Sequence, residues 1–226
     1  MHKRYTCPDI ENIWSEKNKY ELWFDIELMV CEAHAKYGNI PKEAVEDIEK
    51  YRWHCVETWG YIDDIEKTTK HDVLAFLTHL SNIIGPNAKY IHMGMTSQDL
   101  LDTCNAMQIS QSIDIIIDRL TAIVNILKKQ AKKYKNTVCV GRSHGIHAEP
   151  TTFGLKLLGH YSAFKRCLEL LLNAVDNICR IKCSGAVGTY SVIDPKIEEY
   201  LADEIGILPE DVSTQVVPRD RFALLM

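Results

Sequence analysis

This chain of 226 residues has no glycine and no proline between Gly94 and Gly141. Apolar side chains recur through this stretch in alternating steps of four and three, at Ile113, Ile117, Leu120, Val124, Leu127, Ala131 and Tyr134. A second stretch repeats the steps, at Leu157, Tyr161, Phe164, Leu168, Leu171, Val175 and Ile178. Such steps average about 3.5 residues, the period of helices that pack nearly parallel in a bundle. The pattern predicts two helices, of about 55 Å and about 40 Å.

Shorter helical segments are expected over residues 13–37, over residues 72–84, from Pro195 to about Ile205, and from Pro218 onward. The first is expected to be continuous and to stop at Gly38, and Pro41 is expected to open the next helix. The pair Thr96 and Asp99 is typical of a capping box and predicts the start of the first long helix. We therefore expect an all-α fold, with a small helical domain over residues 1–93 and long bundle helices over residues 94–226.

Charge and composition exclude several classes of protein. Lys and Arg total 26 against 31 Asp and Glu, a net charge of −5, which argues against a protein that coats nucleic acid. No apolar run is long enough to cross a bilayer, and the N-terminus lacks a secretory segment, so a cytoplasmic location is expected. The 8 cysteines contain no C-x-x-C pair and are expected to be small buried hydrophobes.

Four polar clusters lie in the breaks between the predicted helices: Arg4-Tyr5, residues 68–72, residues 94–99 and residues 141–152. The second joins Lys70 and His71 to a helix start, where a cation, an imidazole and free N–H groups can receive a carboxylate or phosphate. The third places the hydroxyls of Thr96 and Ser97 at a helix start, which suits the same anions. Ordinary helix capping is the alternative interpretation of both, and an ordinary surface pair is the alternative at Arg4-Tyr5.

The fourth cluster is the densest and is expected to be a loop between the two long helices. It contains Arg142, His144, His147 and Glu149, bounded by Gly141 and Pro150. A histidine with a pKa near neutral is a natural general acid or base. The spacing His-x-x-His is also half of a metal site, but the loop offers no clear third ligand.

These motifs together resemble the N-terminal part of the adenylosuccinate lyase family, in the fumarase/aspartase superfamily. The matching segments are residues 4–5, 69–73, 94–99, 141–154, 184–190, 213–215 and 219–221. They follow the order of the family and span essentially the whole chain, and the segment 141–154 is the most specific. The resemblance implies an all-α subunit, assembled into a homotetramer around a core of long helices. It also implies cleavage of a C–N bond that releases fumarate from adenylosuccinate and from the succinylated carboxamide ribotide of purine synthesis.

The resemblance also implies a role for individual residues. His144 is expected to be the general acid that protonates the leaving nitrogen, and His71 the second active-site histidine. The substrate-binding residues it implies are Arg4 and Tyr5 for the nucleotide, Lys70, His71 and Asp72 beside them, Thr96 and Ser97 for the succinyl carboxylates, and Gln215. A small nucleotide substrate is therefore expected, with no cofactor, metal, nucleic acid or membrane partner.

Two departures from the family pattern affect this expectation. Many relatives carry Arg where this chain has Lys70, which keeps the charge but loses the bidentate geometry. The family's general base is a serine within Ser-Ser-x-Met-Pro-x-Lys-x-Asn-Pro, and this sequence lacks that motif. The last predicted helix also stops on Ala-Leu-Leu-Met, so we expect the chain to be a fragment. We expect this fragment to be inactive alone, because in the family each active site combines residues from three subunits. The alternatives are another fumarate-releasing lyase, such as argininosuccinate lyase, or a non-catalytic helical assembly.

Overall fold

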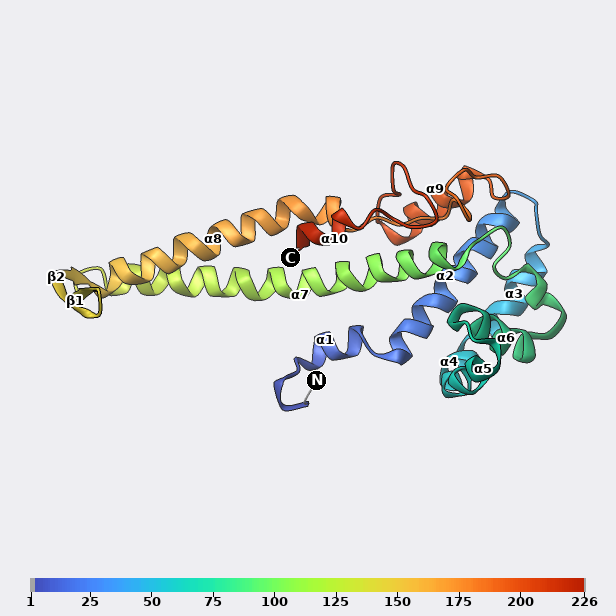
Figure 1. The fold of residues 1–226 in the computed structure, drawn as a ribbon, viewed down its shortest axis with the longest axis horizontal. Coiled ribbons are helices and arrows are strands. Elements are labelled where there is room, and N and C mark those ends of the chain that lie inside the picture. The colour runs from blue at the N-terminus through green and yellow to red at the C-terminus, as the bar shows by residue number, and fades with distance from the viewer. Residues whose placement is uncertain (1–2, 226) are drawn as a thin grey trace. The chain divides into compact units, whose positions relative to one another are not determined.

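The computed structural model describes residues 3–225 (Figure 1). Its elements are η1 (Lys3–Tyr5), α1 (Pro8–Ile13), α2 (Glu16–Lys36), α3 (Lys42–Lys50), α4 (Arg52–Glu57), η2 (Trp59–Tyr61), α5 (Ile62–Thr69), α6 (Asp72–Ile84), η3 (Gly85–Tyr90), α7 (Ser97–Lys133), β1 (Val138–Ser143), β2 (Ile146–Thr152), α8 (Phe153–Ile178), α9 (Pro195–Ile205) and α10 (Asp220–Leu225). The predicted all-α class is confirmed, with one short two-stranded sheet added to it.

The chain divides into two compact units. The first, which we call the head unit, runs to Gln111 and includes Asp176–Leu224. The second, the helical arm, is Ser112–Val175 with Leu225. The long helices α7 and α8 each begin in one unit and end in the other. The domain boundary expected between residues 93 and 94 stays a prediction.

The core of the head unit is built on α2. Trp23, Phe24 and Ile26 of this helix are almost fully buried, and α2 contacts α3, α4 and α9. The ring of Trp23 meets the ring of Phe76 from α6 edge to face, with centroids 5.3 Å apart. Burial of this apolar surface supplies most of the favourable free energy for folding the unit.

The prediction of one continuous helix over residues 13–37 is wrong. The helix breaks at Trp14 and Ser15, and a new helix begins at Glu16. The Ser15 hydroxyl accepts a hydrogen bond from the Asn18 N–H at 3.2 Å and donates one to the Asn12 carbonyl at 2.8 Å. A serine that bonds to backbone groups on both sides ends one helix and caps the next, which apolar periodicity alone does not reveal.

On α7 of the helical arm, the predicted apolar positions are the more buried ones, whereas Phe164, a predicted position on α8, is exposed. Ala131 is buried, and Ile117, Leu120, Val124 and Leu127 are all less exposed than the residues between them on α7. Figure 1 shows α8 returning in the direction opposite to α7. The alternating steps of four and three therefore predicted the face that α7 turns toward its neighbour.

The prediction of a loop over residues 141–152 is wrong, because the segment forms most of a β-hairpin. Strand β1 pairs with β2 in antiparallel register, from Val138 opposite Thr152 to Ser143 opposite Ile146. The turn consists of His144 and Gly145, both with positive φ, at 51° and 76°. Positive φ at both central residues is typical of the type I′ turn, whose twist matches that of the strands.

Two further sequence predictions can be compared with the structure. No helix within residues 3–225 is both long and apolar enough to cross a membrane.

The burial expected for the cysteines is confirmed at Cys31, Cys55, Cys104, Cys179 and Cys183. Cys7 and Cys139 are half-buried, and Cys167 is exposed on α8.

Candidate active site

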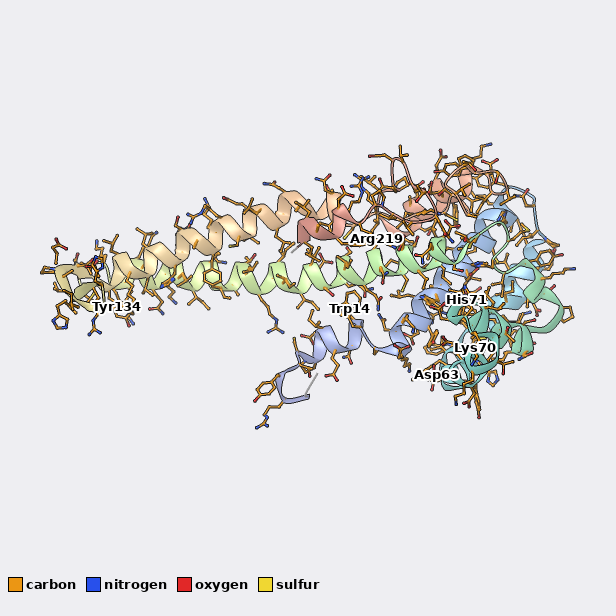
Figure 2. All side chains as sticks on the ribbon, viewed as in Figure 1. Trp14, Asp63, Lys70, His71, Tyr134 and Arg219 are labelled. Carbon is orange, nitrogen blue, oxygen red and sulfur yellow. The ribbon has the colours of Figure 1, made fainter. Side chains whose placement is uncertain are left out.

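The junction between α5 and α6 positions Lys70 and His71 in the head unit (Figure 2). Lys70 ends α5 in the left-handed conformation, with φ 55°, and its N–H donates to the Glu66 carbonyl at 2.8 Å. His71 caps α6, because its Nδ1 accepts the Leu74 N–H at 3.2 Å. Both side chains are exposed, so a cation and an imidazole face solvent at a helix N-terminus.

The structure brings two of the predicted clusters together, since His71 Nε2 lies 3.3 Å from the Ser97 hydroxyl. Because Nδ1 accepts a backbone N–H, the proton of the neutral ring is on Nε2 and points to Ser97. Asp72 lies beside the ring, with its carboxylate 3.3 Å from Nδ1.

The predicted capping box at the start of α7 is confirmed in part. The Thr96 N–H donates to the Asp99 carboxylate at 2.8 Å, as a capping box requires. The N-terminal end of a helix carries partial positive charge, so the hydroxyls of Thr96 and Ser97 stand where an anion is favoured. The hydroxyl of Ser97 and the imidazole of His71 thus form one polar surface.

Sequence reasoning missed the buried partners of Asp99. Its carboxylate pairs with the ammonium of Lys182, and neither side chain is exposed. It also accepts the N–H groups of Ser184 at 3.1 Å and Gly185 at 3.2 Å. The signal in the sequence was that Lys182 lies between two apolar residues, Ile181 and Cys183, shortly after a long helix. A lysine in an apolar stretch indicates a buried acidic partner, because lysine is almost never fully buried unless it is paired.

The segment that leads into α7 is held by a second buried acid, Glu27 of α2. Its carboxylate accepts the backbone N–H of His92 at 2.8 Å and the His92 Nδ1–H at 2.6 Å. Burial by itself lowers the pKa of the His92 imidazole, but the hydrogen bond and charge of Glu27 outweigh it, and the pKa is raised. His92 has a positive φ of 63°, so these bonds hold a strained turn directly before the predicted anion-binding residues.

Gln215 is exposed on a segment that is anchored on both sides. The hydroxyl of Ser213 lies 2.8 Å from that of Ser184, and the N–H of Val217 donates to the buried Asp102 carboxylate at 2.8 Å. Arg219 also donates to Asp102, at 2.8 Å. The structure thus ties the Gln215 segment to α7 and to the segment after Lys182.

Arg4 and Tyr5 belong to the short helix η1 in the same unit and are exposed. The guanidinium of Arg4 lies 5.4 Å from the centre of the Tyr5 ring, a cation–π arrangement.

His144 is at the exposed tip of the hairpin in the helical arm, whereas the other predicted site residues belong to the head unit. His144 has a left-handed backbone, so it belongs to the turn between the two strands and not to either strand. Within residues 3–225, no group of three or more His, Cys, Asp or Glu side chains is placed to hold a metal ion.

The Lyase family model matches residues 2–226. The chain belongs to this family. Its relatives include the adenylosuccinate lyase of Aquifex aeolicus, 43% identical over 226 residues, which is 100% of this chain and 52% of that protein. The adenylosuccinate lyase of Bacillus subtilis is 42% identical over 223 residues, 99% of this chain and 51% of that protein. The chain therefore spans about half the length of the curated relatives it matches.

Solved structures of the superfamily share the fold. The fumarate lyase of Mesorhizobium sp. BNC1 superposes with a TM-score of 0.86 at 26% identity, covering 96% of this chain and 52% of that chain. The 3-carboxy-cis,cis-muconate lactonizing enzyme of Pseudomonas putida gives a TM-score of 0.90 at 26% identity, covering 98% and 52%. The chain therefore has the fold of a fumarase/aspartase superfamily lyase and is similar in sequence to the N-terminal portion of adenylosuccinate lyases.

Proposed function

We propose that the protein carrying this chain is an adenylosuccinate lyase that releases fumarate from adenylosuccinate, leaving AMP, and from the succinylated carboxamide ribotide. The observation that carries the proposal is the 43% identity to an adenylosuccinate lyase along the whole chain, against 26% for the fumarate and muconate enzymes. The contact between His71 and Ser97 supports it, because the two form a surface suited to a carboxylate.

The reaction is a β-elimination. A base removes a proton from the carbon beside a carboxylate, the C–N bond breaks, and its electrons go to the purine nitrogen. In this proposal the His144 imidazolium donates the proton to that nitrogen, so the products are fumarate and AMP. The base is supplied from outside this chain, and the chain alone is expected to be inactive.

The binding residues divide by the part of the substrate they hold. Thr96 and Ser97 receive the succinyl carboxylates through their hydroxyl groups, with the N–H of Ser97 beside them, and His71 supports them. The remaining binding residues are Arg4 and Tyr5 for the nucleotide, Lys70 and Asp72 on the same surface, and Gln215.

We further propose a homotetramer in which the hairpin of one subunit completes the site of another. The cytoplasmic location expected from the sequence stays a prediction.

The test uses the protein at the full length of its relatives. Fumarate release is followed by ultraviolet absorbance with adenylosuccinate and then with argininosuccinate. The proposal expects turnover of the first only. Turnover of argininosuccinate alone would support the other superfamily lyase, and turnover of neither would support the non-catalytic assembly.

The role of His144 is tested with His144→Asn, because Asn tolerates the left-handed backbone of the turn but cannot donate the proton. We expect kcat to fall by about 10²- to 10⁴-fold with the fold unchanged by circular dichroism. His54→Asn, at an exposed histidine of α4, is the matched control and is expected to keep parental kcat. Near-parental turnover of His144→Asn would remove His144 as the acid.

A further inference from the structure

The pair of Asp99 and Lys182 is the most buried ionic contact among the described residues of the head unit. Neither side chain has any exposed surface. The Lys182 ammonium bonds the Asp99 carboxylate and donates to the Gly185 carbonyl at 2.8 Å. Burying two charges costs free energy that apolar side chains of similar volume would not cost, so a buried pair is weak evidence for stability alone.

The Asp99 carboxylate links two separate segments of the chain. From the start of α7 it accepts the Thr96 N–H, and from the segment after α8 it accepts the N–H groups of Ser184 and Gly185. With the ammonium of Lys182, four donors therefore converge on one carboxylate. Each bond is directional, so together they fix both the distance and the orientation between the two segments.

The backbone of Lys182 is fixed to α7 as well. The Thr103 hydroxyl donates to the Lys182 carbonyl at 3.0 Å and accepts the Lys182 N–H at 3.1 Å. Both ends of this residue, its backbone and its ammonium, are thus attached to α7. Thr103 is itself fully buried, so water does not compete for these bonds.

The linkage continues from the Lys182 segment to the segment that carries Gln215. The Ser184 hydroxyl lies 2.8 Å from the Ser213 hydroxyl. A Cβ at Gly188 would lie 2.2 Å from the Ser213 carbonyl oxygen, so the two backbones are in close contact. Asp99 and Lys182 therefore stand at the centre of a network that connects Ser97 at one end with Gln215 at the other.

We infer that Asp99 and Lys182 are positioning residues, whose buried ion pair holds the first turn of α7 and the Gln215 segment in one arrangement for binding the substrate. The identity of that substrate rests on the proposed function. The physical reason is preorganisation: side chains that are held before binding lose less entropy when the substrate arrives. Neither residue needs to touch the substrate to act in this way.

The experiment uses Lys182→Met in the full-length protein, because the unbranched Met side chain is only one atom shorter than that of Lys and carries no charge. The matched control is Arg221→Met, which breaks another largely buried pair of the head unit, between Arg221 and Glu210. Arg221 bonds Glu210 and the Asn177 carbonyl, outside the network of Asp99. Hydrogen–deuterium exchange of the Thr96, Ser184 and Gly185 amides, kcat, KM and the unfolding temperature are measured for parent and variants.

We expect Lys182→Met to speed exchange at these three amides and to lower kcat/KM by about tenfold or more while the protein stays folded. Arg221→Met is expected to lower the unfolding temperature as well, with parental exchange at these amides and parental KM. Parental exchange and KM in Lys182→Met would overturn the inference, as would equal changes in both variants. If the parent releases no fumarate from adenylosuccinate, the proposed function fails, and the exchange data alone decide the positioning role.

Discussion

At the scale of single residues, the head unit shifts the pKa values of two histidines in opposite directions, for the buried His34 and the half-buried His92. His34 is neutral, since its Nε2 donates to the Met93 carbonyl at 3.1 Å and its Nδ1 accepts from Asn39 at 3.0 Å, and burial lowers its pKa. His92 faces the Glu27 carboxylate, and its pKa is raised. The partner, more than the degree of burial, decides which form each ring takes.

The raised pKa of His92 predicts a pH-dependent stability. A histidine whose folded pKa exceeds the unfolded value stabilises fully below about pH 6.5, and the contribution is lost as pH rises through the folded pKa. We expect His92→Gln to lower the free energy of unfolding by about 2 kcal/mol near pH 6, because a hydrogen bond to a charged group is lost. Measured by urea unfolding, the difference in free energy of unfolding between His92→Gln and the parent should be smaller near pH 9. A difference that is constant or grows with pH would contradict this assignment.

At the scale of elements, the turns and short segments decide how the site is built. His144 and Gly145 form a two-residue turn, because both have a left-handed backbone. This turn allows the polar segment on either side of it to pair as a β-hairpin. Gly188 allows the segment after Lys182 to contact the backbone of Ser213. These are backbone requirements, and hydrophobic periodicity carries no information about them.

Two glycines allow a matched test of that close contact. Gly188 and Gly206 have nearly the same φ, 75° and 74°, but an added Cβ meets the Ser213 oxygen at 2.2 Å only at Gly188 and has open space at Gly206. We expect Gly206→Ala to cost about 1 kcal/mol of unfolding free energy from left-handed strain. Gly188→Ala should cost about 3 kcal/mol or more, because backbone must also shift. Equal losses in denaturant titrations would show that the segment relaxes around the new methyl group.

At the scale of the whole molecule, the helical arm leaves apolar side chains uncovered. Ile116, Ile123 and Ile126 of α7 are exposed and lie on one face, seven and three residues apart. On α8, Leu155 and Leu158 are exposed at 60% and 47%. These residues lie off the predicted heptad positions, so packing α7 with α8 does not cover them. Apolar surface of this kind is typical of an interface with other chains.

We expect the 226-residue chain to self-associate in sedimentation velocity through this surface. Leu155→Glu combined with Leu158→Glu should shift the sedimenting species toward a monomer of 25.9 kDa, because a charge buried in an apolar contact is costly. Val212→Glu, at an exposed valine of the head unit, adds a charge elsewhere and should leave association unchanged. A parent chain that sediments as a monomer would contradict the expected assembly.

The sequence by itself determined the two long helices, the face that α7 buries and the family, because apolar periodicity and the site motifs are local patterns along the chain. It also located the ends of α6, which Gly85 follows, and placed α9 from Pro195 to about Ile205, as the structure has it. Only the tertiary structure decided that His71 meets Ser97 and that Asp99 receives Lys182, because those partners are 26 and 83 residues apart. Contacts at such separations depend on how the helices pack, and packing is a property of the whole fold that no local pattern encodes.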